Sequence, residues 1–229
     1  MNAGMEPLQA RFRERAARDL DLLRRHLAAD DVAAPEVEAT AHKLAGSAAL
    51  FGYAEVGLAA RDVDLAFTAG RRPGRDLLEA LAARLAGVCA VEPAASLTET
   101  PVAAAGGGET ILIVEDDELL RAHAERQLRR LGYRVLVAAG GDDVLARLET
   151  LPPIDLLFTD LTLPGEAGGE ALARAVRSRR PGLRVLFTSG KGGREAASAA
   201  APGHPFLPKP YRRDALAATV RHALDQPVT

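Results

Sequence analysis

The chain of 229 residues is poor in several residue types, and each shortage excludes a class of protein. Its single cysteine, Cys89, has no second thiol in the chain, so no internal disulfide can form. Aromatic residues make up only 4%, with no tryptophan, which argues against a surface that stacks nucleic-acid bases. A formal net charge of −2 leaves no excess of basic residues for a nucleic-acid backbone. We therefore expect no nucleic-acid partner.

Long apolar runs are also missing. No run approaches the length that crosses a bilayer, and the first fifteen residues lack the apolar region of a signal peptide. These absences predict a cytoplasmic protein without membrane insertion. Hydrophobic residues nevertheless make up 48% of the chain, enough for ordinary cores, and its length suits two modest domains.

The first part of the chain has the period of amphipathic helices. Leu8, Phe12, Ala16, Leu20 and Leu23 recur at spacings of three and four, which places them on one helical face. The same pattern, with Pro35 at a first turn and Gly70 at an end, predicts helices over 6–28, 35–50, 53–69 and 75–90. Four consecutive helices with short joints favour an antiparallel four-helix bundle over residues 1–92.

Residues 93–108 contain proline, small residues and a triple glycine without any period, which is typical of a flexible linker. From residue 109 to 229 short apolar strands alternate with helices. The strands are expected at 111–114, 134–137, 155–159, 184–188 and 205–207, and the helices at 118–130, 142–149, 170–178, 194–200 and 212–224. Five such units predict an α/β domain with a doubly wound, five-stranded parallel sheet.

Acidic residues follow the first and third of these strands. The run ILIV leads directly into Glu115 and Asp116, and the third strand delivers Asp160 to its end. Neighbouring strands of a doubly wound sheet bring these carboxylates together, where they repel unless a cation neutralises them. Oxygen-only ligands at a site suited to phosphate chemistry predict Mg²⁺.

The last two strands end in groups that can hold a phosphoryl group. FTSG supplies the hydroxyls of Thr188 and Ser189, and FLPKP supplies the ammonium of Lys209. Each of these residues could instead have a purely structural role. Ser189 and residues 115–117 could cap helices, and Lys209 could be a surface charge. Their joint placement at the ends of the expected strands favours one site, in which Asp160 attacks a phosphoryl group.

Residues 110–224 resemble the response-regulator receiver domain of two-component signalling, by the order and spacing of these motifs. The resemblance implies that Glu115 and Asp116 bind the metal, that Asp160 is the phosphoacceptor and that Thr162 offers its backbone carbonyl to the metal. It further implies that Ser189 contacts the phosphoryl group, that Lys209 is the lysine of the fifth strand and that the Lys209–Pro210 bond is cis.

A histidine in the second helix is the other candidate. In the run AHKLAGSAALFGY, Ala41, Leu44 and Ala48 form the core face, and His42 lies roughly 200° around the helix from Leu44, toward solvent. The small residues Ala45, Gly46 and Ala49 share its side of the helix. They would leave room for another protein to dock.

His42, Leu44 and Gly46 match the H-x-L-x-G motif of the histidine-containing phosphotransfer (HPt) domain, which this part of the chain resembles. The resemblance implies that His42 relays a phosphoryl group, with a sensor histidine kinase and other receiver or HPt proteins as partners. The leading interpretation is a phosphorelay protein rather than a turnover enzyme.

Three alternatives stay open at this point. The bundle could only dock or dimerise, with an inert His42, while phosphorylation switches the second half. It could instead be a dimerisation bundle of the histidine-kinase type, although no glycine-rich ATP-binding domain follows. A phosphatase of the haloacid-dehalogenase type is less favoured, because neither EDDE nor DLTLP places a second aspartate two residues after a first-strand nucleophile.

Overall fold

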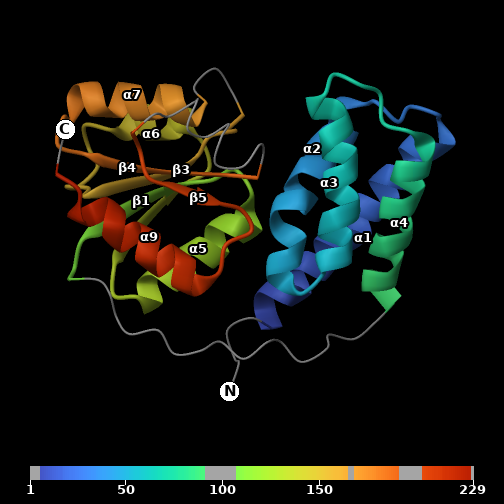
Figure 1. The fold of residues 1–229 in the computed structure, drawn as a ribbon, viewed down its shortest axis with the longest axis horizontal. Coiled ribbons are helices and arrows are strands. Elements are labelled where there is room, and N and C mark those ends of the chain that lie inside the picture. The colour runs from blue at the N-terminus through green and yellow to red at the C-terminus, as the bar shows by residue number, and fades with distance from the viewer. Residues whose placement is uncertain (1–5, 91–106, 165–167, 191–202, 228–229) are drawn as a thin grey trace. The chain divides into compact units, whose positions relative to one another are not determined.

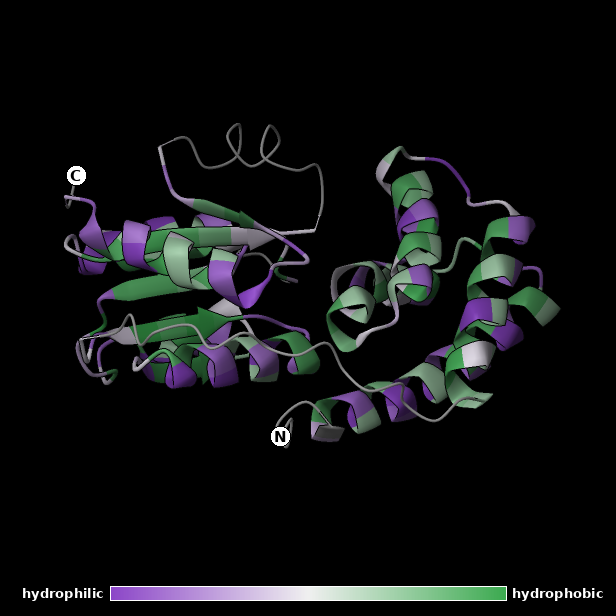
Figure 2. Ribbon diagram, turned by 60° about the horizontal axis from the view of Figure 1, so that its bottom comes forward, coloured by the Kyte–Doolittle hydropathy of each residue, from purple (hydrophilic) through white to green (hydrophobic). Residues whose placement is uncertain are grey.

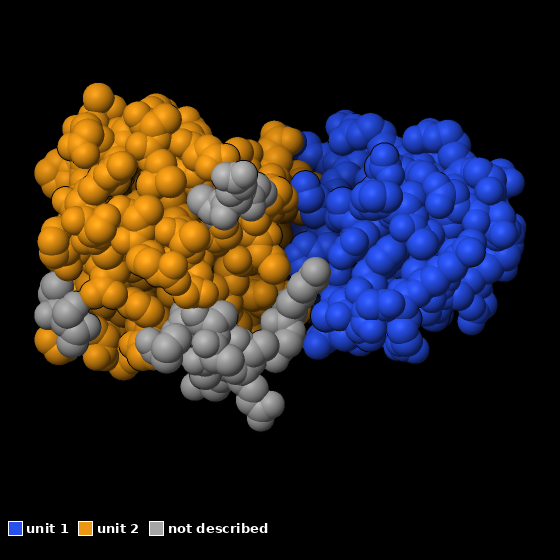
Figure 3. Space-filling view, turned by 90° about the horizontal axis from the view of Figure 1, so that it is seen from above, with its two compact units in different colours: residues 1–100 blue, residues 101–229 orange. Residues whose placement is uncertain are grey.

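A computed structural model describes residues 6–90, 107–164, 168–190 and 203–227. The chain divides into two compact units, residues 1–100 and residues 101–229, which Figure 3 distinguishes by colour. Each unit is described by itself below.

The N-terminal unit is a bundle of four helices (Figure 1). Its elements are α1 (Glu6–Ala28), α2 (Pro35–Ser47), the 3₁₀ helix η1 (Ala48–Phe51), α3 (Ala54–Thr68) and α4 (Arg75–Ala90). Helix α1 packs mainly against α4, and α2 packs mainly against α3. The predicted bundle is confirmed, and the predicted bounds of the first and fourth helices agree with those of α1 and α4.

The core of the bundle is built from the apolar stripes that the sequence predicts. Leu8, Phe12, Ala16, Leu20 and Leu23 are all buried along α1. The ring of Phe12 stacks on the ring of Tyr53 at 5.1 Å between centroids and lies 5.3 Å from that of Phe51. Aromatic rings from both sides of the turn after α2 therefore anchor that turn to the first helix.

The second helix ends earlier than predicted. Helix α2 stops at Ser47, and the next four residues tighten into η1 instead of continuing the α-helix to residue 50. Gly52 then takes a left-handed conformation (φ 94°), while the amide of Tyr53 donates to the carbonyl of Ala48. Glycine adopts this conformation without the steric penalty of a side chain, so the helix can end in a short turn before α3.

The C-terminal unit contains a five-stranded parallel sheet of order β2-β1-β3-β4-β5. The strands are β1 (Thr110–Val114), β2 (Arg134–Ala138), β3 (Leu156–Asp160), β4 (Arg184–Ser189) and β5 (Phe206–Pro208). Each predicted strand is present with its bounds shifted by at most one residue at either end. Strands β1, β3 and β4 are buried almost throughout, as expected of a parallel sheet covered on both faces.

Helices cover both faces of this sheet (Figures 1 and 2). They are α5 (Glu118–Arg130), α6 (Gly141–Arg147), α7 (Gly169–Arg179) and α9 (Arg213–Asp225). Alternate residues of β1 belong to different cores. Ile111 and Ile113 share one core with residues of α5 and α9, whereas Leu112 and Val114 share the other with residues of α6 and α7. The doubly wound architecture that the sequence predicts is confirmed.

Two expectations fall on residues outside the described ranges: the helix at 194–200 and most of the linker at 93–108. Among the described helices, none is both long and apolar enough to cross a membrane.

Because each unit has its own core, we predict that the halves fold independently. Fragments 1–92 and 109–229 should each unfold cooperatively, at a temperature close to that of the matching transition in the whole chain. Calorimetry of both fragments beside the full chain measures this. A fragment without a cooperative transition would show that the domain boundaries or the independence are wrong.

Candidate functional site

The carboxylates at the ends of β1 and β3 meet at one edge of the sheet. Parallel pairing sets Val114 beside Thr159, so the next residue on each strand, Glu115 and Asp160, is brought to the same place. Glu115, Asp116 and Asp160 each offer one carboxylate oxygen, and these oxygens all lie within 4.8 Å of one another. The predicted convergence of these three residues is confirmed.

Lys209, just after β5, lies between two of these carboxylates. Its Nζ is 2.6 Å from Glu115 Oε2 and 2.6 Å from Asp160 Oδ2. The side chains of all three residues are buried, with 3% of Lys209 and Asp160 and 6% of Glu115 exposed. The alternative interpretation of Lys209 as a surface charge is therefore wrong. The peptide bond from Lys209 to Pro210 is cis, as the resemblance implies.

Burial and this ion-pair network set the charges of the three groups. Burial raises the pKa of Glu115 to about 7, although the ammonium of Lys209 opposes the shift. Burial would also raise the pKa of Asp160, but the charge and hydrogen bond of Lys209 outweigh it and hold that pKa below its usual range. Burial disfavours the charged form of Lys209, yet the two carboxylates raise its pKa above the ordinary value. One ammonium thus faces more carboxylates than it can neutralise.

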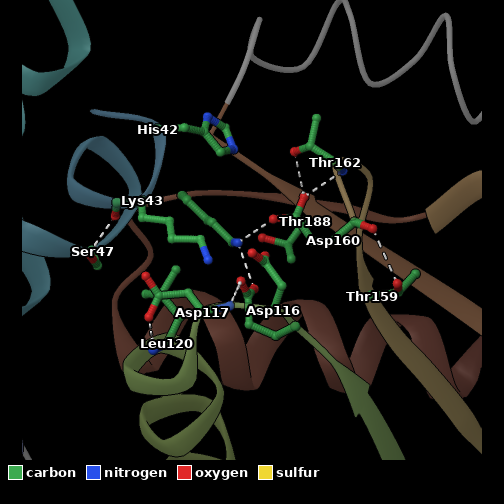
Figure 4. Close-up of polar contacts among 12 residues, drawn as sticks. His42, Lys43, Ser47, Asp116, Asp117, Leu120, Thr159, Asp160, Thr162 and Thr188 are labelled. Carbon is green, nitrogen blue, oxygen red and sulfur yellow. Dashed lines mark hydrogen bonds and ion pairs between the residues drawn. The ribbon is translucent and has the colours of Figure 1, made fainter. Parts of the chain in front are cut away.

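Two donors from the loop after β3 orient Asp160. The backbone amide and the hydroxyl of Thr162 donate to Asp160 Oδ1, at 2.9 Å and 3.0 Å (Figure 4). One oxygen of Asp160 therefore faces Thr162 and the other faces Lys209. The sequence indicated a role for the backbone of Thr162 but did not indicate this contact of its hydroxyl.

Asp117 has a different role from the acids before it. Its Oδ1 accepts from the amides of Leu119 and Leu120 and so caps helix α5. The capping alternative for the acidic run is thus correct for Asp117. The cap is formed by Asp117, whereas Glu115 and Asp116 belong to the cluster at the edge of the sheet.

The two hydroxyl residues at the end of β4 make different contacts. The hydroxyl of Thr188 donates to the carbonyl of Leu207 on β5, at 2.8 Å, and so links β4 to β5 within the sheet. Ser189 is buried at the end of β4, and its carbonyl accepts from the amide of Lys209 at 3.0 Å. The predicted Ser189, at the end of β4, and Lys209, just after β5, are therefore joined by a backbone hydrogen bond.

Gly169, at the start of α7, allows close approach to the backbone of Asp160. A Cβ atom at this position would lie 1.9 Å from the carbonyl oxygen of Asp160 and 2.8 Å from its carbonyl carbon. The preceding Gly168 has ordinary room, with the nearest atom 3.6 Å from such a Cβ. Position 169 thus requires glycine. The sequence GGE does not reveal this constraint, because nothing in it shows which of the two glycines packs against the backbone.

The oxygen ligands of the cluster fit a small divalent cation. Mg²⁺ binds oxygen ligands at about 2.1 Å, so ligands on opposite sides of the ion stand about 4.2 Å apart. The carboxylate oxygens of Glu115, Asp116 and Asp160 lie within 4.8 Å of one another, and their excess negative charge favours a cation. The chemistry of this donor set therefore suits Mg²⁺.

His42 lies on α2 of the N-terminal unit, with 25% of its side chain exposed. Its Nδ1 is 3.2 Å from Oδ1 of Asp64 on α3, whose side chain is 7% exposed. Of its predicted small neighbours, Ala45 and Ala49 are partly exposed and Gly46 is buried. Asp64 was not predicted. The sequence offers one hint of its role: Asp64 follows Val63 on the side of the third helix that faces the core.

Comparison with known proteins assigns both halves of the chain. A family model described as Hpt domain matches residues 7–91, and one described as response regulator receiver domain matches residues 111–221. The chain has an Hpt domain followed by a response regulator receiver domain. These two domains are parts of two-component phosphorelay signalling, and the predicted resemblance is confirmed in both halves.

Individual relatives match the receiver half. The sensor kinase CckA of Brucella abortus is 35% identical over 127 residues, which are 52% of this chain and 13% of that protein. The DNA-binding transcriptional regulator NtrC of Salmonella typhimurium is 33% identical over 116 residues, 50% of this chain and 24% of NtrC. The matches thus span between about an eighth and a quarter of these relatives. A solved response regulator receiver protein from Sinorhizobium medicae is 27% identical with a TM-score of 0.47, covering 52% of this chain and 96% of that one.

The contact at Gly169 generates a prediction for stability. Gly169→Ala should lower the free energy of unfolding of the receiver domain by roughly 2 kcal/mol or more, because its Cβ must displace the backbone of Asp160. Gly168→Ala is the matched control and should lower it by less than about 1 kcal/mol, the size of a weaker N-cap. Urea unfolding of the full chain, with amide hydrogen exchange in β3, measures both. Equal effects of the two substitutions would contradict the steric account.

Proposed function

We propose that Asp160 of the receiver domain accepts a phosphoryl group and that His42 of the Hpt domain relays one. The observation that carries the first assignment is the position of Lys209, whose Nζ is 2.6 Å from both Asp160 and Glu115, two acids of the cluster that also contains Asp116. A fixed ammonium, together with a cation held by the surplus carboxylates, suits a step that transfers an anionic phosphoryl group to a carboxylate.

The receiver step uses groups at the ends of β3, β4 and β5. An oxygen of Asp160 attacks the phosphorus of a phosphohistidine donor, the P–O bond forms, and the P–N bond breaks with its electron pair returning to the donor imidazole. Lys209 would then neutralise oxygens of the transferred group, while the hydroxyl of Ser189 contacts them. The hydrogen bonds from Thr162 would fix the carboxylate before the attack.

Mg²⁺ is the proposed cofactor of this step. Glu115, Asp116, Asp160 and the backbone carbonyl of Thr162 would hold it, and when bound it neutralises charge on the phosphoryl oxygens. The excess of carboxylates over ammonium in the cluster supports this assignment.

Both acceptors would only receive and pass on a phosphoryl group, so the chain acts as a phosphotransfer protein and not as a turnover enzyme. The receiver domain would catalyse its own Mg²⁺-dependent phosphorylation. The partners would be a sensor histidine kinase and other receiver or Hpt proteins.

A second candidate is a phosphorylation-switched interaction module. In this case the receiver domain is phosphorylated, while the Hpt domain only docks or dimerises and His42 stays inert. The exposed Leu58 and Leu65, seven residues apart on α3, favour a docking role for the bundle.

We predict that acetyl phosphate labels Asp160 of the full chain when Mg²⁺ is present, with a label lost in hydroxylamine. Asp160→Asn should abolish this label because the nucleophile is lost, and Asp116→Ala should require more Mg²⁺ because a ligand is lost. Asp143→Asn, which changes an exposed acid on α6, is the control and should label like the wild type. Full hydroxylamine-labile labelling of the Asp160→Asn chain would exclude Asp160.

We further predict that His42 carries a phosphoryl group exchanged with a receiver aspartate. In an Asp160→Asn background, a phosphorylated receiver from the source cell should give a base-stable, acid-labile label. His42→Gln should remove that label, and His26→Gln, at a histidine paired with Asp31 on the same bundle, should keep it. If no receiver or kinase system of the source cell labels His42, the interaction module replaces the relay.

A further inference from the structure

Helix α3 presents two exposed leucines on the side that faces away from the core of the bundle. Leu58 is 60% exposed and Leu65 is 50% exposed; among the described residues, the only other large hydrophobic side chain that is mainly exposed is Val137, at 39%. The two leucines are seven residues apart, so they lie within about 20° of each other around the helix. A single exposed leucine is ordinary, but two on one helical face form the start of an apolar surface.

A basic and an acidic residue stand between these leucines on the same face. Arg61 and Asp62 are both exposed and lie within about 60° of Leu58 around the helix. Consecutive residues on a helix do not face each other, so these two charges cannot pair within α3. Within the ranges that the structure describes, neither side chain has an ion pair or hydrogen bond with another residue. Both charges are therefore available to a partner.

The outer face of α3, as defined here, consists of six exposed residues on the helix and its C-cap: Ala54, Leu58, Arg61, Asp62, Leu65 and Ala69. This face is complementary to itself when it is read in reverse. Positions at equal distances from its centre hold matching residues: alanine and alanine at 54 and 69, leucine and leucine at 58 and 65, and opposite charges at 61 and 62. Such a pattern suits contact between identical surfaces related by a twofold axis.

We propose that the outer face of α3 is the surface through which two copies of this chain pair, with their α3 helices antiparallel. Leu58 of one copy then lies against Leu65 of the other, on both sides of the axis. Arg61 of each copy meets Asp62 of the other, and these two ion pairs set the direction of the helices. A parallel pair would instead place Arg61 against Arg61, where like charges repel.

The size of this face determines how tightly the copies associate. Helix α3 has 15 residues and is therefore about 22 Å long. Two helices of this length bury less surface than the roughly 1,600 Å² of a standard stable complex. The dimer should therefore form reversibly and dissociate on dilution.

The pairing does not depend on the chemistry proposed for His42. Asp64, which contacts His42, lies about 120° around α3 from Leu58. Contact through the outer face thus leaves that side of α3 uncovered. A dimer neither requires nor excludes a relay through His42, so failure of one proposal leaves the other intact.

A different protein is the alternative occupant of this face, and an exchange of the two charges distinguishes it from a second copy. A different protein would meet Arg61 and Asp62 with fixed charges of its own, so the exchange would weaken its binding. A second copy carries the same exchange, so both ion pairs form again with their signs reversed.

The first measurement is sedimentation velocity of the unphosphorylated full chain over a series of concentrations. The wild type should shift from monomer to dimer as its concentration rises. Arg61→Asp places like charges at both ion pairs and should weaken the association by roughly tenfold. Arg61→Asp combined with Asp62→Arg should restore it to within about threefold of the wild type. Val137→Ser, at the exposed valine of the other unit, is the control and should pair like the wild type.

The second measurement tests the antiparallel direction by crosslinking. Cys89→Ala first removes the one native thiol, which is exposed. Chains with Leu58→Cys are then mixed with chains with Leu65→Cys and treated with a thiol crosslinker that spans about 8 Å, the separation of closely packed helices. The mixture should crosslink more efficiently than either chain alone, because only the mixture sets two thiols opposite each other. Circular dichroism checks that each variant keeps its helices.

Three results would overturn the proposal. The first is a wild-type chain that stays monomeric up to roughly 1 mM, the weak end of specific association. The second is a dimer that Arg61→Asp leaves intact or that the exchanged pair fails to restore, because another surface would then hold the copies together. The third is more efficient crosslinking of Leu58→Cys chains to each other than to Leu65→Cys chains, which an antiparallel pair does not allow.

Discussion

The receiver site depends on the contact of one buried ammonium with two carboxylates. Lys209 follows the outermost strand β5 and reaches Glu115 and Asp160, which are 94 and 49 residues away along the chain. Without this cation, the acids after β1 and β3 would repel one another in an environment that solvates them poorly. Its single charge cannot neutralise three carboxylates, so the site retains an affinity for further positive charge. The same electrostatic imbalance that makes the site unstable by itself favours the binding of a metal ion.

The Hpt domain arranges charge in the opposite sense. In the receiver domain a cation contacts the carboxylate of Asp160, the proposed acceptor, whereas in the bundle the carboxylate of Asp64 lies 3.2 Å from the ring of His42. In the proposed relay, Asp160 would become an acyl phosphate whose negative charge Lys209 can balance, and His42 would take the phosphoryl group beside the carboxylate of Asp64.

The sequence predicts much of this organisation because its local patterns agree with the fold. Uninterrupted apolar runs such as ILIV define the buried strands, and residues immediately after them, including Glu115 and Asp160, must lie at the edge of the sheet. The stripe from Leu8 to Leu23 defines the core face of α1 in the same way. The position of His42 on its helix follows from the 3.6-residue period. These inferences need only one element at a time, or the order of strands in a known type of sheet.

What the sequence did not reveal depends on pairs of elements in contact. Asp64 becomes meaningful only when α3 packs on α2, and no spacing along the chain specifies which residues then face each other. Gly169 is required because α7 starts against the carbonyl of Asp160, a tertiary distance that the doubled glycine cannot show. The hydroxyl of Thr162 is a similar case, since its hydrogen bond depends on the course of the loop after β3. The early end of α2 at Ser47 reflects a 3₁₀ turn that the ring of Phe12 on α1 anchors.

The central claim is that both acceptors carry phosphoryl groups in the cell. The most direct measurement is to isolate the full chain from its source cell without acid treatment and to locate phosphate by mass spectrometry on the peptides that contain His42 and Asp160. The account predicts phosphate on both peptides, with the His42 phosphate surviving base and the Asp160 phosphate lost in hydroxylamine. Phosphate confined to the Asp160 peptide, under conditions in which the signalling system is active, would contradict the relay.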